Sequence, residues 1–331
     1  MNINKFIPPY PLKTAVLFLI FNRLDTTKQV FEAIRQAKPP KLYVAADGPR
    51  GNKEGEAEKV KAVREYVMNN IDWNCEVKTL FRDRNLGCKF AVSSAITWFF
   101  KNEEMGIILE DDCIPSQSFF WFCEKLLERY KDDNRIMMIC GSNFIKKDLS
   151  YLEEDYFFSN YYPVWGWATW RRAWKTYDVN ISYWHIFKEN KQLNWLCDIR
   201  VAEYYENMFN LIVKGLDTWD FQWCFNCLFN NGLSIIPKKN TIKNIGLEGT
   251  HSATHGDNCI GLDTNEFQCE KLIPPSYITP DIILNKYLFS DSHANIDFSK
   301  NIHLVRLKKI LIKKIPAFLK PFLRFIFRKN K

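Results

Sequence analysis

Long apolar runs are missing from this chain of 331 residues. The longest clear run, from Ala15 to Phe21, is far shorter than the roughly 20 residues that span a bilayer, so we expect no transmembrane helix. The first residues read Met-Asn-Ile-Asn-Lys-Phe and lack the pattern of a secretory signal. The ten cysteines have no disulfide-scaffold spacing, and we interpret Cys224 and Cys227 as buried thiols rather than half of a zinc site. We therefore expect a reducing, cytoplasmic environment.

Acidic residues are absent from one end of the chain. Residues 301–331 contain ten Lys or Arg and no Asp or Glu, whereas the rest carries 36 basic and 38 acidic residues. The formal charge of +8 is thus concentrated in this tail, and the remainder is close to neutral. A nucleic-acid-binding body would carry a basic face of its own, so we exclude nucleic acid as a partner.

The basic tail also has an apolar pattern. Leu304, Leu307, Leu311 and Ile315 recur at helical spacing among the basic residues, and phenylalanines then alternate with Lys and Arg. This composition suits the surface of an anionic membrane. We expect residues 301–331 to hold the protein, as a peripheral protein, at the inner face of the plasma membrane. Packing on a partner subunit is the alternative.

The first 110 residues alternate between apolar runs and amphipathic stretches. This βαβαβαβ order predicts an α/β fold with a mostly parallel sheet and flanking helices. We expect strands at 16–21, 42–46, 77–81 and 106–109, and helices at 25–34, 54–68 and 90–100. Asp25 is the expected N-cap of the first helix.

Later elements are predicted from the same patterns, and the sequence there contains no internal repeat or low-complexity linker before the tail. We expect helices at 119–129, 191–212 and 220–228, and strands at 136–140 and 233–237. An aromatic stretch at 156–170 could line an acceptor pocket, and the last strand leads into a loop at 244–256.

In open α/β sheets, ligands bind beyond the carboxyl ends of the parallel strands. Four predicted strand ends should therefore converge on one crevice. They carry Asn22-Arg23, Asp47-Gly48, the segment 82–87 and the triplet Glu110-Asp111-Asp112.

Three adjacent carboxylates at the end of a buried strand repel one another unless a cation or hydrogen-bond donors neutralise them. Oxygen ligands of this kind suit Mn²⁺ or Mg²⁺, which can bridge carboxylates to the phosphates of a nucleotide. The alternative is a solvated acidic turn that caps the next helix. The position of Glu110, Asp111 and Asp112 after the fourth strand favours the metal.

The sequence resembles bacterial nucleotide-sugar glycosyltransferases of the GT-A fold, which are similar to the animal N-acetylglucosaminyltransferase that initiates complex N-glycans. The resemblance covers about residues 14–256. It is carried by Leu17-Phe-Leu-Ile-Phe-Asn-Arg, Ala46-Asp-Gly-Pro-Arg, Arg84-Asn-Leu-Gly, Ile108-Leu-Glu-Asp-Asp, Gly166-Trp-Ala-Thr-Trp and Trp219-Asp. It implies one GT-A domain at 1–300, with a donor-binding half at about 13–140 and an acceptor-side half at about 141–260, followed by the tail.

The resemblance also implies roles for the crevice residues. Asp112 would ligate a metal that holds the donor diphosphate, with Asp111 near the ribose or donor sugar and Glu110 beside it. Asp47 would accept a hydrogen bond from uracil, and Arg23 would contact the nucleotide. For these last two the ordinary alternatives are a turn residue and an ion pair with Asp25.

Two further donor-side positions follow from the Arg84-Asn-Leu-Gly motif. Asn85 and Gly87 are expected to shape the wall of the donor pocket, because glycine permits close approach of the backbone. A simple turn leading into the next helix explains the motif equally well.

Transfer with inversion needs a base that takes the proton of the acceptor hydroxyl. Asp220 matches the family position for this base, although the animal enzyme has a second adjacent acid where this chain has Phe221. Asp217 is close enough to be the base instead, and a helix N-cap is the structural alternative for Asp220. His251 and His255 are further candidates for the metal, since many GT-A enzymes supply a late His to it.

Together these features predict an inverting glycosyltransferase that uses Mn²⁺ or Mg²⁺. Its partners would be a nucleotide-sugar donor, for which the resemblance favours a UDP-sugar, and a glycan or lipid-linked acceptor in bacterial surface polysaccharide synthesis. The first alternative is a sugar-phosphate nucleotidyltransferase, but no Gly-rich triphosphate loop lies near the first strand. The second is a non-enzymatic membrane-bound binding protein on the same fold.

Overall fold

The computed structural model describes residues 6–246 and 262–292. The tail at 301–331, for which the sequence predicts membrane association, lies outside the described residues. Among the helices that the structure does describe, none is long and apolar enough to cross a membrane.

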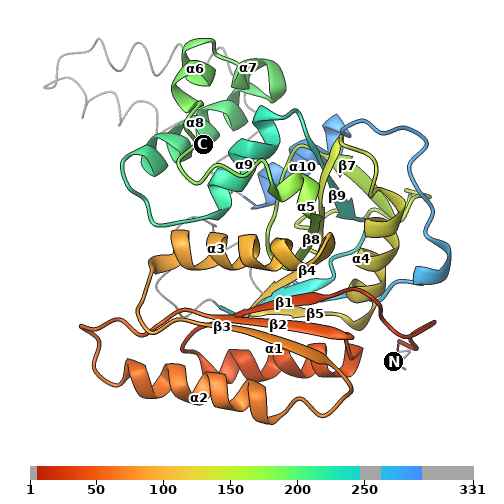
Figure 1. Cartoon of the computed structure of the whole chain (residues 1–331). Helices are drawn as coiled ribbons and strands as arrows, with labels where there is room; N and C mark the ends of the chain where they lie inside the picture. The colour runs from red at the N-terminus through yellow and green to blue at the C-terminus, as the bar shows by residue number, and fades with distance from the viewer. Residues whose placement is uncertain (1–5, 247–261, 293–331) are drawn as a thin grey trace, which may run out of the picture.

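A large mixed sheet forms the centre of the molecule (Figure 1). Its strands in the described ranges run in the order β3-β2-β1-β4-β8-β6-β9-β7. The first four pair in parallel, as do β6 and β9, whereas β8 and β7 are antiparallel to their neighbours. The strands are β1 Val16–Ile20, β2 Lys41–Ala46, β3 Glu76–Phe81, β4 Met105–Glu110, β6 Ile136–Cys140, β7 Tyr156–Ser159, β8 Trp167–Trp170 and β9 Leu233–Pro237. The predicted α/β fold with a mostly parallel sheet is confirmed.

Helices cover both faces of this sheet. In Figure 1, α1 and α2 lie below it and α3 and α9 lie above it. The helices are α1 Leu24–Ala37, α2 Glu56–Asn69, α3 Gly87–Asn102, α4 Gln117–Arg129, α5 Arg171–Trp174, α6 Trp184–Glu189, α7 Leu193–Leu196, α8 Ile199–Val213, α9 Asp220–Phe229 and α10 Ile282–Ser292, with a short 3₁₀ turn η2 at Cys269–Lys271.

The alternation of side chains along β1 explains the two layers. Phe18 points to the cluster that contains Phe31 of α1, whereas Leu17 and Leu19 point to the cluster that contains Phe99 of α3. Successive residues of a strand face opposite sides of its sheet. A strand that is apolar on both sides must therefore be covered on both sides, and full burial of each such side chain contributes about 1.5–3 kcal/mol.

The start of α1 differs from the prediction. The helix begins at Leu24, its N-cap is Arg23, and Asp25 lies in the first turn, so the prediction that Asp25 is the N-cap was wrong. Arg23 has an extended backbone, and its side chain bonds to Asp111 and Asp112 in the turn after β4 rather than to the helix. An acidic residue in the first turn still interacts favourably with the helix dipole.

The predicted helix at 191–212 is two helices. Cys197 is extended and ends α7, and the carboxylate of Asp198 accepts a hydrogen bond from the backbone N–H of Arg200 to begin α8. The apolar spacing continues through this break, because both helices pack on the same core. The apolar periodicity therefore does not show that a new helix begins after Asp198.

The aromatic stretch at 156–170 forms strands rather than an open pocket. β8 lies between β4 and β6, and Trp167 is fully buried and stacks on Trp219 with ring centroids 5.7 Å apart. The residues of β7 are buried as well. The expectation that this whole stretch lines an acceptor pocket is wrong for the two strands, because their rings fill the core.

A two-stranded ribbon beside the main sheet completes the fold. β5, Cys113–Pro115, directly follows the acidic triplet and pairs antiparallel with β10, Ile242–Asn244. Asn244 lies opposite Cys113 in this pairing. The ribbon therefore returns the chain, more than a hundred residues later, to the carboxyl end of β4.

Candidate functional site

The acidic triplet lies at the carboxyl end of β4 beside the end of β1. The parallel register places Leu19 of β1 opposite Glu110, so the residues that follow β1 reach the triplet. Nη2 of Arg23 donates to Oδ1 of Asp111 and, over 2.9 Å, to Oδ2 of Asp112. The expected convergence of these two strand ends is present, and the alternative in which Arg23 pairs only with Asp25 is not.

Asp111 is the most deeply placed carboxylate of the three. The residue is 4% exposed, and its Oδ2 is buried with no hydrogen-bond partner in the described part of the chain. Burial raises the pKa of Asp111 to about 6, against the opposing effect of Arg23. A buried oxygen without a donor is costly and is normally explained by a missing water, ion or ligand.

The Glu110 carboxylate, next to Asp111, has no hydrogen bond or ion pair with any residue of 6–246 or 262–292. Burial raises its pKa well above the usual value, and the neighbouring charges of Asp112, Asp111 and Asp220 raise it further. Arg23 supplies one positive charge against three carboxyl groups. The site is therefore poorly neutralised and suits an added cation.

The end of β2 and the turn before α3 form a second group. Asp47 accepts hydrogen bonds from the backbone N–H of Gly48, at 2.9 Å, and from that of Leu86, at 3.0 Å to either oxygen. Asn85 donates from Nδ2 to the carbonyl of Gly48, and its Oδ1 accepts from the N–H of Gly87. Both side chains thus hold the two loops together, and burial raises the pKa of Asp47.

The two loops approach each other very closely at Gly48. A Cβ atom at this position would lie 2.4 Å from the backbone of Arg84. The glycine of the Asp47-Gly48-Pro sequence is therefore required by packing between the loops. Backbone contacts that Asp47 and Asn85 stabilise therefore fix these two loops against each other.

Gly87 starts α3 and contacts a residue from the other half of the chain. Its φ of +77° favours glycine, and a Cβ atom there would lie 2.8 Å from Oδ2 of Asp217. The Asp217 carboxylate accepts the backbone N–H groups of Cys88, at 3.0 Å, and Lys89, at 2.8 Å. Asp217 therefore caps α3, and the Arg84-Asn-Leu-Gly motif is a turn leading into that helix.

Asp220 is the first residue of α9 and is half-buried. Its Oδ1 accepts from the hydroxyl of Thr218 and from the N–H of Phe221, while its Oδ2 has no hydrogen-bond partner within 6–246 and 262–292. Its charge contributes to the raised pKa of Glu110 and of Cys88, so Asp220 lies near both groups. Hydrogen bonds thus hold Oδ1 of Asp220, while Oδ2 can accept a proton or a further hydrogen bond.

The chain after β10 passes directly over Asp112. The backbone N–H of Ile245 donates to the carbonyl of Asp112 at 2.9 Å, and a Cβ atom at Gly246 would lie 2.1 Å from its Oδ2. The predicted loop at 244–256 therefore begins at the acidic site. His251 and His255 lie outside the described residues.

A buried carboxylate, Glu56, that pairs with Arg50 was not singled out from the sequence. Glu56 is 4% exposed and accepts hydrogen bonds from Arg50 and, at 2.9 Å, from Nδ2 of Asn22. These bonds connect the loops after β1 and β2. The local sequence does not indicate that Glu56 joins these loops, because acidic residues are common in the first turn of a helix.

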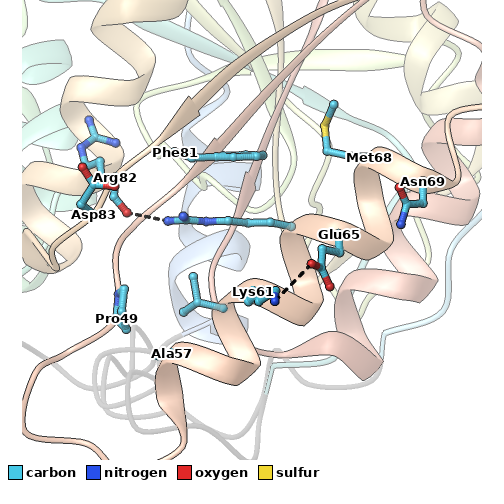
Figure 2. Close-up of a pocket in the computed structure, with 11 residues that line it drawn as sticks. Pro49, Ala57, Lys61, Glu65, Met68, Asn69, Phe81, Arg82 and Asp83 are labelled. Carbon is cyan, nitrogen blue, oxygen red and sulfur yellow. Dashed lines mark hydrogen bonds and ion pairs between the residues drawn. The ribbon is translucent and has the colours of Figure 1, made fainter.

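A separate pocket of about 480 Å³ lies between α2 and the edge strand β3 (Figure 2). Phe81 forms one wall, and Lys61 and Glu65 form an ion pair at another. Arg64 lies over the Phe81 ring and donates to the carbonyls of Asp47 and Arg82, at 3.1 and 2.6 Å. None of the predicted site residues lines this pocket, so it is distinct from the crevice.

The described residues contain no group of three or more His, Cys, Asp or Glu arranged to hold a metal ion. What they provide is a pair of carboxylates, Asp111 and Asp112, with one buried oxygen unpaired. Carboxylate oxygens are the ligands that Mn²⁺ and Mg²⁺ prefer, and such ions often complete their shell with water and phosphate. The donor set therefore fits a hard divalent cation shared with an anionic ligand.

No protein-family model and no curated protein matches this chain. Solved structures with partial similarity include HddC from Yersinia pseudotuberculosis, at 9% identity and a TM-score of 0.31, over 51% of this chain and 83% of that one. The structure of GalNAc-T7 with UDP, GalNAc and Mn²⁺ has 13% sequence identity and a TM-score of 0.39, over 69% of this chain and 43% of that one. The 4-diphosphocytidyl-2C-methyl-D-erythritol synthase from Anaerococcus prevotii has 6% sequence identity and a TM-score of 0.30, over 48% of this chain and 72% of that one. Similarity at this level does not decide between sugar transfer and nucleotidyl transfer.

Proposed function

We propose that this protein is a metal-dependent, inverting glycosyltransferase that transfers a sugar from a UDP-sugar to a glycan or lipid-linked acceptor. The observation that carries the proposal is the cluster of Arg23, Asp111 and Asp112 at the carboxyl end of β4, with a buried carboxylate oxygen that lacks a partner among the described residues. Parallel α/β sheets bind their ligands at this edge.

Asp112 and Asp111 are the residues that would hold the metal. An Mn²⁺ or Mg²⁺ ion held there would supply positive charge to a departing diphosphate. Arg23 and the backbone around Gly48 and Leu86 then form the rest of the donor site. We assign Asp47, Asn85 and Gly87 to the wall of that site and Glu110 to the floor beneath the donor sugar.

Asp220 is our candidate for the base that takes the proton of the acceptor hydroxyl. Its Oδ2 has no partner among the residues that are described, whereas both oxygens of Asp217 accept backbone hydrogen bonds from α3. A base must be within hydrogen-bond reach of its proton and free to accept it. This difference favours Asp220 over Asp217.

The acceptor side and the domain limits remain part of the proposal. We propose one catalytic domain at 1–300 and a membrane-associating tail at 301–331 that brings the active site to lipid-linked glycans. The composition of the tail supports this, since each basic residue near an anionic membrane contributes about 1 kcal/mol. His251 and His255 are proposed as further metal ligands on the basis of the family resemblance.

The proposal is tested by incubating the full chain with a panel of UDP-sugars and Mn²⁺ and measuring released UDP. We expect release that EDTA abolishes and that Asp112→Ala lowers by about a hundredfold or more. Pyrophosphate formed from a sugar 1-phosphate and UTP, without UDP release from any UDP-sugar, would identify a nucleotidyltransferase instead. If the protein binds a UDP-sugar but neither wild type nor Asp112→Ala releases UDP, it is a binding protein.

A further inference from the structure

The guanidinium of Arg23 occupies the position where the proposed function requires a metal. Its Nη2 bonds to one oxygen of each of the two carboxylates that would be ligands. The Arg23 side chain is 34% exposed, while those of Asp111 and Asp112 are 6% and 17% exposed. The arginine therefore covers the carboxylates from the solvent side, and a divalent cation that takes these oxygens must displace it.

Arg23 is charged whenever the carboxylates are. An arginine guanidinium keeps its positive charge throughout the pH range in which proteins fold. Removing the guanidinium from the carboxylates thus breaks two charge-assisted hydrogen bonds. A cation that arrives alone offers the arginine no new partner except water.

A nucleoside diphosphate changes this balance. Nε and Nη1 of Arg23 donate to no other residue in the described ranges, and the planar guanidinium fork fits phosphate oxygens in a bidentate geometry. When the cation and the diphosphate arrive together, the cation can take Asp111 and Asp112 while Arg23 takes the phosphate. Every charge then keeps a partner of opposite sign.

We propose that Arg23 is the counter-ion of the acidic site in the metal-free protein and a diphosphate ligand in the loaded one. The exchange makes the cation and the nucleoside diphosphate each strengthen the binding of the other. The inference rests on the proposed function. It goes beyond a nucleotide contact by Arg23, because it assigns that residue a role in the affinity for the cation when no nucleotide is present.

The coupling has a definite sign in each direction. Since binding coupling is reciprocal, UDP should tighten Mn²⁺ binding by the same factor as Mn²⁺ tightens UDP binding. A factor of about tenfold or more lies in the usual range for coupled sites. Without the guanidinium, Mn²⁺ alone should bind more tightly and UDP in the presence of Mn²⁺ should bind more weakly. The coupling factor should therefore fall to the part that comes from direct attraction between Mn²⁺ and the diphosphate.

The test is a titration of the full chain with Mn²⁺, with free Mn²⁺ measured by electron paramagnetic resonance, in the absence and presence of UDP. We compare wild type with Arg23→Met, which keeps the apolar stem, and with Arg35→Met as a control. Arg35 pairs with Glu32 and Asp72 on the surface of α1. Should Arg23→Met fail to fold, Arg23→Gln, which retains one amide donor, replaces it.

We expect Arg23→Met to bind Mn²⁺ alone about tenfold more tightly than wild type and to show a clearly smaller effect of UDP on Mn²⁺ binding, with Arg35→Met unchanged. If wild type shows coupled binding and Arg23→Met shows the same coupling, the inference is wrong while the proposed function stands. If wild type binds neither Mn²⁺ nor UDP, both are wrong. Loss of Mn²⁺ binding in Asp112→Asn places the measured ion at this site.

Discussion

At the scale of single residues, the structure separates two aspartates that the sequence leaves equivalent. Asp217 and Asp220 are three positions apart, and either could be the proposed base. The carboxylate of Asp217 is committed to the start of α3, while Asp220 keeps one oxygen without a partner in the described residues.

We expect Asp220→Asn to lower kcat by about 10²–10⁴-fold with little change in UDP affinity, because it removes a base and not a donor contact. Asp217→Asn should instead lower the free energy of unfolding by about 1 kcal/mol, as loss of a helix cap does, and reduce kcat less than tenfold. Steady-state kinetics and chemical denaturation measure both. A larger loss of kcat in Asp217→Asn than in Asp220→Asn would reverse the assignment.

A second residue-scale prediction concerns the buried pair of Glu56 and Arg50. The hydrogen bond from Arg50 lowers the pKa of Glu56 from 4.5 to about 2. A lowered carboxyl pKa contributes stability above the unfolded value, and that contribution is lost as the pH falls from about 4.5 towards 2. Wild type should therefore exceed Glu56→Gln in stability at pH 7, and most of the difference should be gone at pH 3.

Urea denaturation at several pH values measures this difference. Glu32→Gln is the matched control, since Glu32 also pairs with an arginine but its side chain is 46% exposed, and exposed pairs contribute at most about 1 kcal/mol. A gap between wild type and Glu56→Gln that stays constant from pH 7 to pH 3 would show that the charge of Glu56 is not what stabilises the loops.

The approach of Arg23 to Asp111 could be predicted from the sequence, but the contact of Asp217 with α3 could not. Arg23 and Asp111 follow strands that a pattern of apolar runs locates, so their convergence follows from the rule for parallel sheets. The capping of α3 by Asp217 spans 128 residues. No local sequence pattern indicates that Asp217 and Lys89 are in contact, because only the folded chain brings them together.

At the scale of elements, the short ribbon of β5 and β10 matters most for the site. It carries the backbone of Ile245 and Gly246 against Asp112. The sequence predicts a loop at this point but not the strand pairing, because three-residue strands have too few positions to show an alternation.

Gly246→Ala tests this contact. The added methyl group would lie 2.1 Å from Oδ2 of Asp112, so the carboxylate or the ribbon must move. We expect the affinity for UDP in Mn²⁺ to fall about tenfold or more, equivalent to at least about 1.4 kcal/mol. Gly51→Ala is the control, because a Cβ atom there meets nothing within 4 Å. Unchanged UDP affinity in Gly246→Ala, measured by calorimetry, would contradict the placement of the donor beside Asp112.

The antiparallel strands show where element prediction from the sequence fails for a physical reason. The aromatic residues of β8 carry no clear alternation, since both faces of this central strand are buried. A fully buried segment loses the polar positions that mark a period. Its rings were therefore interpreted as a possible pocket lining although they belong to the core.

At the scale of the whole molecule, the separation between a near-neutral body and a basic tail predicts two independent functions. Ending the chain at residue 300 should release it from vesicles that contain anionic lipid while leaving UDP release from the donor unchanged. Vesicle sedimentation with full-length and shortened chains measures this, with neutral vesicles as the control. Vesicle binding that survives the truncation would show that another surface binds the membrane.

The central claim is that the end of β4 binds a nucleoside diphosphate together with a divalent cation. Its most direct test is a thermal-shift measurement with UDP, with and without Mn²⁺, on wild type and Asp112→Ala. We predict that UDP at roughly a hundredfold excess over its Kd raises the Tm of wild type by about 5 °C in Mn²⁺, far less in EDTA, and not at all for Asp112→Ala. If no nucleoside diphosphate stabilises wild type in the presence of Mn²⁺, the account of this site is wrong.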